Sequence, residues 1–133
     1  MKYLLDTDTC IYALKQDHSV IESLLACDRE DVAVSVISEA ELRTGAAKSS
    51  SPIKTLSLIE NFLRPLTLLD FTSGDAVVYA SVRAKLERSG TPIGPLDTLI
   101  AAQAIARKLT LVSNNERELK RVAGLQTENW KRS

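Results

Sequence analysis

Short apolar runs in this chain repeatedly end at a polar cluster that leads into a segment with helical spacing. This order is typical of strand, turn and helix units, whose strands pair in a parallel sheet. The predicted strands are residues 3–5, 32–37, 66–69 and 110–112, with a short edge strand at 125–130. The predicted helices include residues 19–26, 38–48, 53–63, 75–88 and 98–108. We therefore predict an α/β fold with a central parallel sheet of four to five strands, flanked by helices.

The length of 133 residues is that of one ordinary domain, so we expect a single domain over residues 1–133. Apolar residues make up 44% of the chain and charged residues 26%, which excludes a disordered or fibrous protein. The N-terminal apolar run is too short for a signal peptide or a membrane span, so we expect a cytoplasmic protein without a membrane partner. Cys10 and Cys27 lie in segments predicted to be apolar helices, as suits reduced thiols.

Acidic residues follow the predicted strands directly. Parallel strands bring their carboxyl ends to one edge of a sheet, where ligands of such folds bind. The residues placed at this edge, or at the start of the last long helix, are Asp6, Asp8, Glu39, Glu41, Asp97, Glu116 and Glu118. A cluster of carboxylates repels itself, and a divalent cation would cancel that cost.

Helix capping is the alternative explanation for each acid taken singly. Asp6 or Asp8 would cap the first helix and Asp97 the fifth. The pairs Ser38 with Glu41 and Asn115 with Glu118 have the spacing of a capping box. Both interpretations stay open for the individual residues, whereas the group as a whole favours a metal site.

The kinds of side chain present favour a hard metal ion. Carboxylate oxygens suit Mg²⁺ or Mn²⁺, and the sequence offers no cluster of cysteine and histidine for zinc. The single histidine, His18, lies in a predicted polar loop, which we interpret as solvated surface. Without a well-placed histidine, a histidine-assisted nucleophile is excluded, and metal-assisted attack by water is the natural chemistry.

Four segments together resemble a known family. They are LLDTD at residues 4–8, AELRTG at 40–45, PIGPLDTLIAAQA at 92–104 and LVSNNEREL at 111–119. In order and spacing they are similar to the signature segments of VapC-type PIN-domain ribonucleases, the toxins of bacterial toxin–antitoxin pairs. The likeness extends to the closing GLQTENW. It implies a three-layer PIN-like fold and an endoribonuclease that hydrolyses RNA, such as transfer RNA, with Mg²⁺ or Mn²⁺.

The resemblance also implies roles for individual residues. Asp6, Glu41 and Asp97 match the three acidic positions that bind the metal. The fourth position, often aspartate in PIN domains, is Asn115 here, and Glu118 one helical turn later is expected to supply the missing charge. Asp8 stands where many relatives have asparagine. Two hydroxyl groups match positions beside the ligands: Thr7 and Ser113.

RNA must be bound by local positive charge, because 17 basic residues balance 17 acidic ones. One basic group consists of Arg83, Lys85 and Arg88. The second lies near the last acidic cluster and is the better candidate for phosphates: Arg107, Lys108, Arg117, Lys120 and Arg121. The alternative is that these residues only form the solvent-exposed faces of helices.

The resemblance further implies a small VapB-like antitoxin that covers the active site, and a homodimer. Apolar residues of the early helices are candidates for such a surface, although stripes of this kind are more often core. They are Ile11, Tyr12, Leu14, Ile21, Leu24 and Leu25.

Two other functions compete with the ribonuclease. The first residues of the LLDTDT segment resemble the start of a haloacid-dehalogenase-like phosphatase motif, with Asp6 as nucleophile and Asp8 as acid. Cys10 then stands where that motif has threonine or valine, and a convincing downstream lysine is missing. The other alternative is a binding module that keeps the PIN fold without catalysis.

Overall fold

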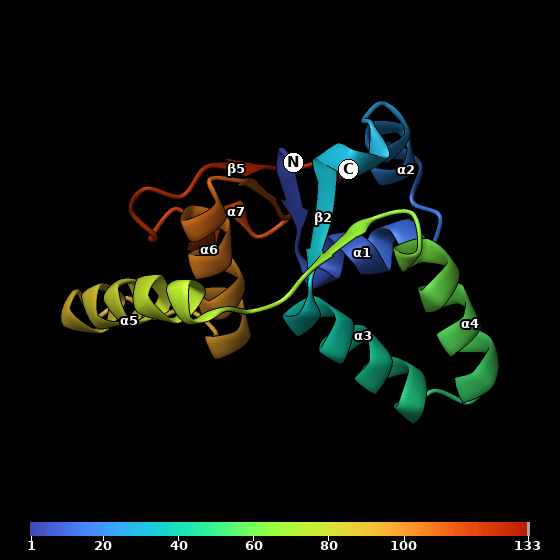
Figure 1. Cartoon of the computed structure of the whole chain (residues 1–133), viewed down its shortest axis with the longest axis horizontal. Helices are drawn as coiled ribbons and strands as arrows, with labels where there is room; N and C mark the ends of the chain where they lie inside the picture. The colour runs from blue at the N-terminus through green and yellow to red at the C-terminus, as the bar shows by residue number, and fades with distance from the viewer. Residues whose placement is uncertain (133) are drawn as a thin grey trace.

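A parallel sheet forms the centre of the computed structural model, which describes residues 1–132 (Figure 1). Within these residues the strands are β1 (Tyr3–Leu5), β2 (Val32–Ser35), β3 (Thr67–Leu69), β4 (Thr110–Val112) and β5 (Thr127–Glu128). Their spatial order is β3-β2-β1-β4-β5, and every neighbouring pair is parallel. The predicted parallel sheet is therefore confirmed, including its short edge strand after residue 125.

Helices cover both faces of the sheet. They are α1 (Thr7–Leu14), α2 (His18–Leu25), α3 (Val36–Lys48), α4 (Pro52–Leu63), α5 (Ser73–Arg88), α6 (Pro95–Arg107) and the short α7 (Glu116–Leu119). Figure 1 shows α5, α6 and α7 on one side of the strands and α1, α3 and α4 on the other. His18 begins α2 instead of lying in a loop, and its side chain is solvent-exposed, as expected.

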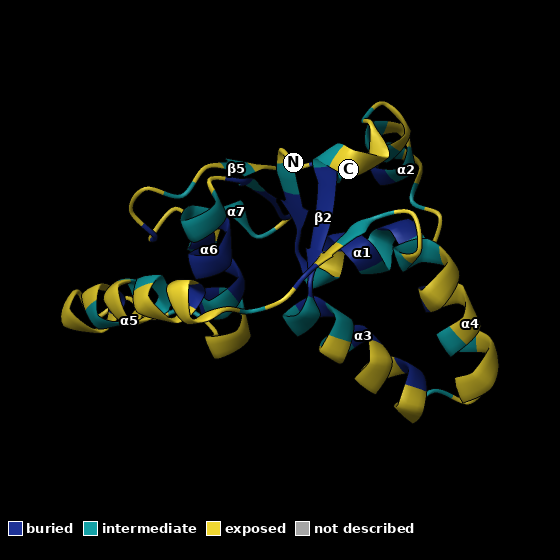
Figure 2. Cartoon of the chain, viewed as in Figure 1, coloured by how far each residue is buried: buried dark blue, intermediate teal, exposed yellow. Residues whose placement is uncertain are grey.

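Consecutive strand residues face opposite layers, so the chain has two apolar cores. Leu4 and Leu111 pack in the cluster under α5, α6 and α7, whereas Leu5 and Val112 pack in the cluster under α1 to α4. This is the alternation that a strand imposes when both faces of its sheet are covered. The three central strands, β1, β2 and β4, are accordingly among the most buried parts of the molecule (Figure 2). The predicted three-layer α/β fold is confirmed.

All five helices for which a range was predicted begin one to three residues before their predicted starts, and the reason is clear for α3 and α6. The Ser35 hydroxyl accepts a hydrogen bond from the Ile37 amide, so α3 begins at Val36 and β2 ends at Ser35, two residues before its predicted end. Helix α6 begins at Pro95, whose fixed φ favours the first helical position. The proposed capping box of Ser38 and Glu41 is therefore wrong, because both residues lie inside α3.

The early apolar residues are mostly core. Five of the six candidates for a partner surface pack against the cluster under α1 to α4, and Leu25 alone stays largely exposed, at 78%. Cys10 is buried in α1, whereas Cys27 lies just beyond α2; both thiols are free. Within residues 1–132, no helix is long and apolar enough to cross a membrane.

A buried ion pair fixes α6 against the start of α5. The Arg107 side chain donates to both carboxylate oxygens of Asp75, at 3.1 and 3.0 Å, and to the Asp70 carbonyl at 3.0 Å. Asp75 is 1% exposed and also accepts from the Thr72 amide in a capping box. Burial alone would raise the pKa of Asp75, but the bonds from Arg107 and Thr72 outweigh it and lower this pKa. Arg107 is thus occupied within the fold.

We predict that Arg107→Gln lowers the free energy of unfolding by about 3 kcal/mol, because it leaves a buried carboxylate without its partner. Since the pKa of Asp75 is lowered in the folded chain, its contribution to stability is present above the unfolded pKa and is lost as pH falls through the folded value. Urea denaturation at pH 7 measures the loss. Arg83→Gln is the control: it breaks an exposed pair with Glu87 and should cost less than about 1 kcal/mol. Equal losses in the two variants would contradict the prediction.

Candidate metal centre

The strand order reverses between the paired strands β1 and β4. The chain passes from β1 outward to β2 and β3, then returns to β4 on the other side of β1, so the flanking segments diverge at the ends of these two strands. In parallel α/β folds, such a switch point is where ligands bind. Asp6 follows β1 directly and Ser113 follows β4. The predicted edge therefore lies at the geometrically expected place for a site.

Asp6 occupies the centre of this edge and is held from several directions. Its amide donates to the Val112 carbonyl at 3.0 Å, and its carboxylate accepts from the Thr9 amide at 2.8 Å as the cap of α1. Its residue is 6% exposed. Burial raises the pKa of Asp6 and outweighs the opposing hydrogen bonds from Ser113 and Thr9. Capping and a role in the site are thus compatible at this residue.

Glu41 comes from the second turn of α3 and is tied to the residue after Asp6. The Thr7 hydroxyl donates to Glu41 Oε1 at 2.6 Å and lies 3.0 Å from the Ser38 hydroxyl. Ser38 is fully buried, so it supports this contact from below. Sequence reasoning included Thr7 but missed Ser38 as its partner. The signal was present in the spacing, since Ser38 and Glu41 lie on one face of a helix.

Asp97 reaches the same edge from the first turn of α6. It is the third residue of that helix and not its cap, which is Gly94. Burial is the main cause that raises the pKa of Asp97 to about 6. The other causes are the negative charges of four carboxylates: Asp6, Glu41, Asp8 and Glu118. The carboxylates that the sequence predicted to gather are therefore close enough to perturb one another.

Glu118 is bound by the residue that departs from the family pattern. Asn115 Nδ2 donates to Glu118 Oε2 at 2.6 Å, while the Asn115 amide donates to the Ser113 hydroxyl at 2.9 Å. Asn115 stands at the cap position of α7, but its side chain makes no capping bond. The capping-box interpretation of this pair is wrong. The neutral amide of Asn115 instead holds the Glu118 carboxylate, which is one of the four negative charges that raise the pKa of Asp97.

The residues fit a hard cation by their chemistry, because the ligand atoms available at this edge are carboxylate and hydroxyl oxygens. Among residues 1–132, no three Asp, Glu, His or Cys side chains already form a complete ligand group for a metal ion. Mg²⁺ usually keeps several of its waters and needs only one or two direct carboxylates. By the chemistry of its donor atoms, the edge therefore fits a hydrated divalent cation.

The predicted RNA-binding residues fall into two sets. Lys108, Arg117, Lys120 and Arg121 are exposed. Arg121 donates to the Pro92 carbonyl at 3.2 Å, which ties the end of α7 to the loop before α6. Arg107 does not belong with these four, because its guanidinium is engaged by Asp75.

Comparison with known proteins supports this picture. The PIN domain family matches residues 3–125. The chain is 37% identical to the tRNA(fMet)-specific endonuclease VapC of Shigella flexneri and 42% identical to the ribonuclease VapC2 of Haemophilus influenzae, each over 130 residues. Both alignments cover 98% of the two proteins compared. The chain belongs to the VapC ribonucleases of the PIN-domain family.

Solved structures agree at the level of the fold. DNA-bound VapBC from Salmonella typhimurium superposes with a TM-score of 0.95 at 37% identity, covering 98% of this chain and 99% of the other. VapBC2 from Rickettsia felis, bound to a promoter DNA fragment, gives a TM-score of 0.93 at 38% identity, covering 98% and 100%. The predicted family and ribonuclease activity are confirmed. The full-length match to ribonucleases also decides against a haloacid-dehalogenase-like phosphatase.

We predict that Asp97→Asn stabilises the metal-free chain at neutral pH and not at low pH. The folded pKa of Asp97, about 6, lies above its ordinary value of 3.8, so between these values the folded chain binds more protons than the unfolded chain. Stability from this group is therefore lost as pH rises through that window. Melting temperatures of both proteins in chelator, from pH 4 to 8, measure the difference. A difference that does not grow with pH would contradict the repulsion among these acids.

Proposed function

We propose that this ribonuclease uses Mg²⁺ or Mn²⁺ held at the edge formed by Asp6 and Asp97. The observation that supports the proposal is the gathering of four further carboxylates near Asp97, whose charges add to burial in raising the pKa of this acid to about 6. A chain that keeps such repulsion at neutral pH gains from a cation that removes it. Glu41 and Glu118 would complete the site from α3 and α7.

The bound cation would supply Lewis acidity to the phosphodiester and lower the pKa of the attacking water. The chain's own residues position the reactants. Asp6 and Asp97 hold charge at the divergence of β1 and β4, and the Thr7 hydroxyl fixes the orientation of Glu41. Glu41 would orient the attacking water, and Glu118, held by Asn115, would add negative charge to the set of residues that hold the cation. The products would be a 5′-phosphate and a 3′-hydroxyl.

We propose a structured RNA, such as transfer RNA, as the substrate. The relatives from Shigella flexneri and Salmonella typhimurium are named tRNA(fMet)-specific endonucleases, at 37% and 38% identity over nearly the whole chain. The exposed basic residues Arg117, Lys120 and Arg121 lie on α7 or directly after it, close in sequence to Glu118, and are suited to bind phosphates. An enzyme of this kind would act in the cytoplasm.

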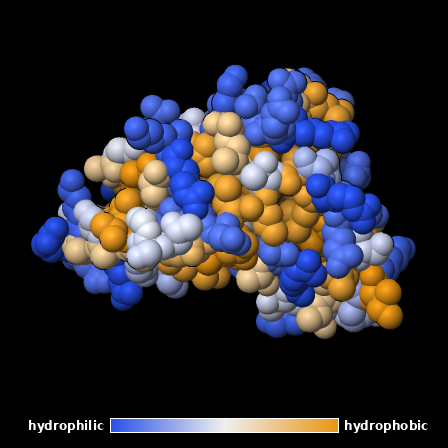
Figure 3. Space-filling model, in the orientation of Figure 1, coloured by the Kyte–Doolittle hydropathy of each residue, from blue (hydrophilic) through white to orange (hydrophobic). Residues whose placement is uncertain are grey.

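We also propose a small VapB-like antitoxin and a homodimer as the assembly of this chain. Solved relatives include VapBC complexes from Rickettsia felis and Salmonella typhimurium. Apolar side chains gather over the middle of one face, between α5 with α6 and α3 with α4 (Figure 3). Three exposed apolar residues lie on α4 and β3: Ile53, Leu58 and Leu68. A partner with an apolar segment would cover part of this surface.

We predict that Asp6→Asn abolishes Mg²⁺-dependent RNA cleavage, because the amide keeps the helix cap but loses the ligand charge. The control is Asp70→Asn, which removes an exposed carboxylate just after β3 that does not contribute to the shift of Asp97. Cleavage of a purified transfer RNA pool, with and without chelator, measures the effect. Wild-type turnover by Asp6→Asn, or an equal loss of turnover in Asp70→Asn, would contradict the proposed site.

We predict that Glu118→Gln lowers turnover at limiting Mg²⁺ by roughly 10-fold, a usual size for loss of a group in the metal shell. The fold should stay cooperative, because Glu118 bonds the Asn115 side chain and no backbone amide. Mn²⁺, which binds such sites more tightly, should restore part of the loss. Asn115→Asp is the matched variant: it places a second carboxylate against Glu118 and should increase dependence on metal concentration. Turnover equal to wild type in Glu118→Gln would contradict the prediction. The metal site would then consist of Asp6, Glu41 and Asp97 without Glu118.

A further inference from the structure

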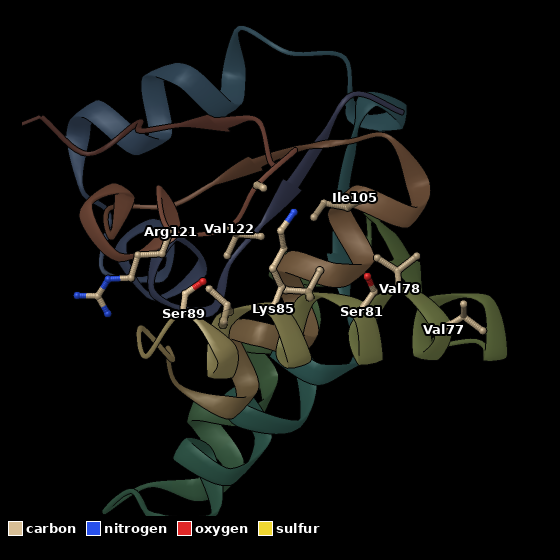
Figure 4. A pocket seen from close by; sticks show the side chains of 11 residues that line it. Val77, Val78, Ser81, Lys85, Ser89, Ile105, Arg121 and Val122 are labelled. Atoms are coloured by element: carbon tan, nitrogen blue, oxygen red, sulfur yellow. The ribbon is translucent and has the colours of Figure 1, made fainter.

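A pocket of about 360 Å³ lies between α5, the end of α6 and the segment after α7 (Figure 4). Apolar side chains form most of its lining, and they come from all three elements. They include Val78, Val82, Leu86, Ile105 and Val122. This volume is within the range of cavities that hold small organic groups. We call it the α5–α7 pocket.

The polar groups of the pocket are hydroxyls and cations only. Ser81 and Ser89 line it from α5, together with Lys85, while Arg121 lines it from the segment after α7. No carboxylate belongs to the lining. Lys85 makes no ion pair with any residue from 1 to 132, and Arg121 uses one nitrogen on the Pro92 carbonyl and pairs with no acid in that range.

Figure 4 shows how these groups lie. The ammonium of Lys85 points toward the space between Val122 and Ile105, and the guanidinium of Arg121 extends outward at the edge. One residue of each basic group, Lys85 on α5 and Arg121 after α7, therefore contributes to the lining of a single apolar hollow. Such a lining suits an occupant with a flat apolar part and negative charge on both sides of it.

Arg121 connects the edge of the pocket to two segments that also carry acids of the candidate metal centre. Arg121 follows Glu118 by one helical turn, and its bond to Pro92 joins the pocket's edge to the loop that leads to Asp97. Within the described part of the chain, the only charged groups that line the pocket are the cations Lys85 and Arg121, which favours a polyanion as the occupant. The occupant most consistent with the ribonuclease activity is therefore part of the RNA itself.

We propose that the α5–α7 pocket is a subsite for one unpaired nucleotide of the RNA substrate, and this proposal rests on the proposed function. The base packs on the valines and isoleucine, the serine hydroxyls bond its edge, and Lys85 and Arg121 bind the flanking phosphates. Recognition of splayed, unpaired bases is the usual way in which proteins distinguish one RNA from another. The pocket would thus contribute to substrate choice without touching the bond that is cleaved.

The test measures binding without cleavage. A fluorescent RNA hairpin with an unpaired loop is titrated in chelator with wild type, Ser81→Leu, which fills the pocket, and Ser81→Ala, which keeps it open. We expect about 10-fold weaker binding for Ser81→Leu and less than 2-fold change for Ser81→Ala, in line with the loss of one base contact. Thermal melts confirm that each variant is folded.

A charge pair completes the design. Lys85→Gln should weaken binding and reduce the dependence of log K on log salt by about 0.7, the value for one phosphate contact to a single strand. Lys54→Gln removes an exposed cation of α4, outside the pocket lining, and should leave that slope unchanged. In addition, RNA carrying 4-thiouridine in its loop should crosslink to α5 or to residues 121–123 in wild type and lose this crosslink in Ser81→Leu.

Two outcomes overturn the inference. Equal RNA affinity of Ser81→Leu and Ser81→Ala, or crosslinks confined to other elements, would show that the pocket holds no nucleotide. Weaker binding of an acidic peptide, but not of RNA, by Lys85→Gln would assign it to a protein partner instead. Because binding is measured in chelator, failure here is separate from failure of the metal proposal, which appears as turnover that ignores Asp6→Asn.

Discussion

The position of Asp6 is the constraint on which the rest of the site depends. Its amide is bonded to β4, its carboxylate caps α1, and its residue lies where β1 ends. One residue thus couples the two strands that flank the switch point to the helix that leaves it. This carboxylate is fixed and buried, and its negative charge contributes to the raised pKa of Asp97.

Two of the remaining acids, Glu41 and Glu118, are held by neutral partners and not by cations. Glu41 accepts from Thr7, and Glu118 accepts from Asn115. Hydroxyl and amide donors fix the direction of a carboxylate without cancelling its charge, so the negative potential of the edge survives. An arginine in either place would instead neutralise the negative charge that the proposed metal ion would bind. The asparagine that departs from the family pattern therefore fits a supporting role.

The order of elements and the parallel sheet could be predicted from sequence, because the chain alternates apolar strands with helical spacing throughout. The acidic residues of the edge could also be found, since they follow the strands directly. Helix starts were less certain, because Ser35 and Ser38 compete as caps and only packing selects the first. Arg107 was assigned to RNA because its partner, Asp75, is 32 residues away, and no local pattern reports such a contact.

Net charge concealed the function for a related reason. Equal numbers of acidic and basic residues exclude a steering field from the whole chain, yet the fold separates part of them in space. Several acids converge at the ends of β1 and β4, while Lys85 and the bases after Glu118 stay without acidic partners among residues 1–132. An RNA backbone would then contact the basic residues on and after α7. Near the start of α7 it would reach the acidic edge, whose charge the proposed metal ion would neutralise. The net charge of zero therefore combines an acidic edge with a basic surface, and it is the fold that separates these two regions in space.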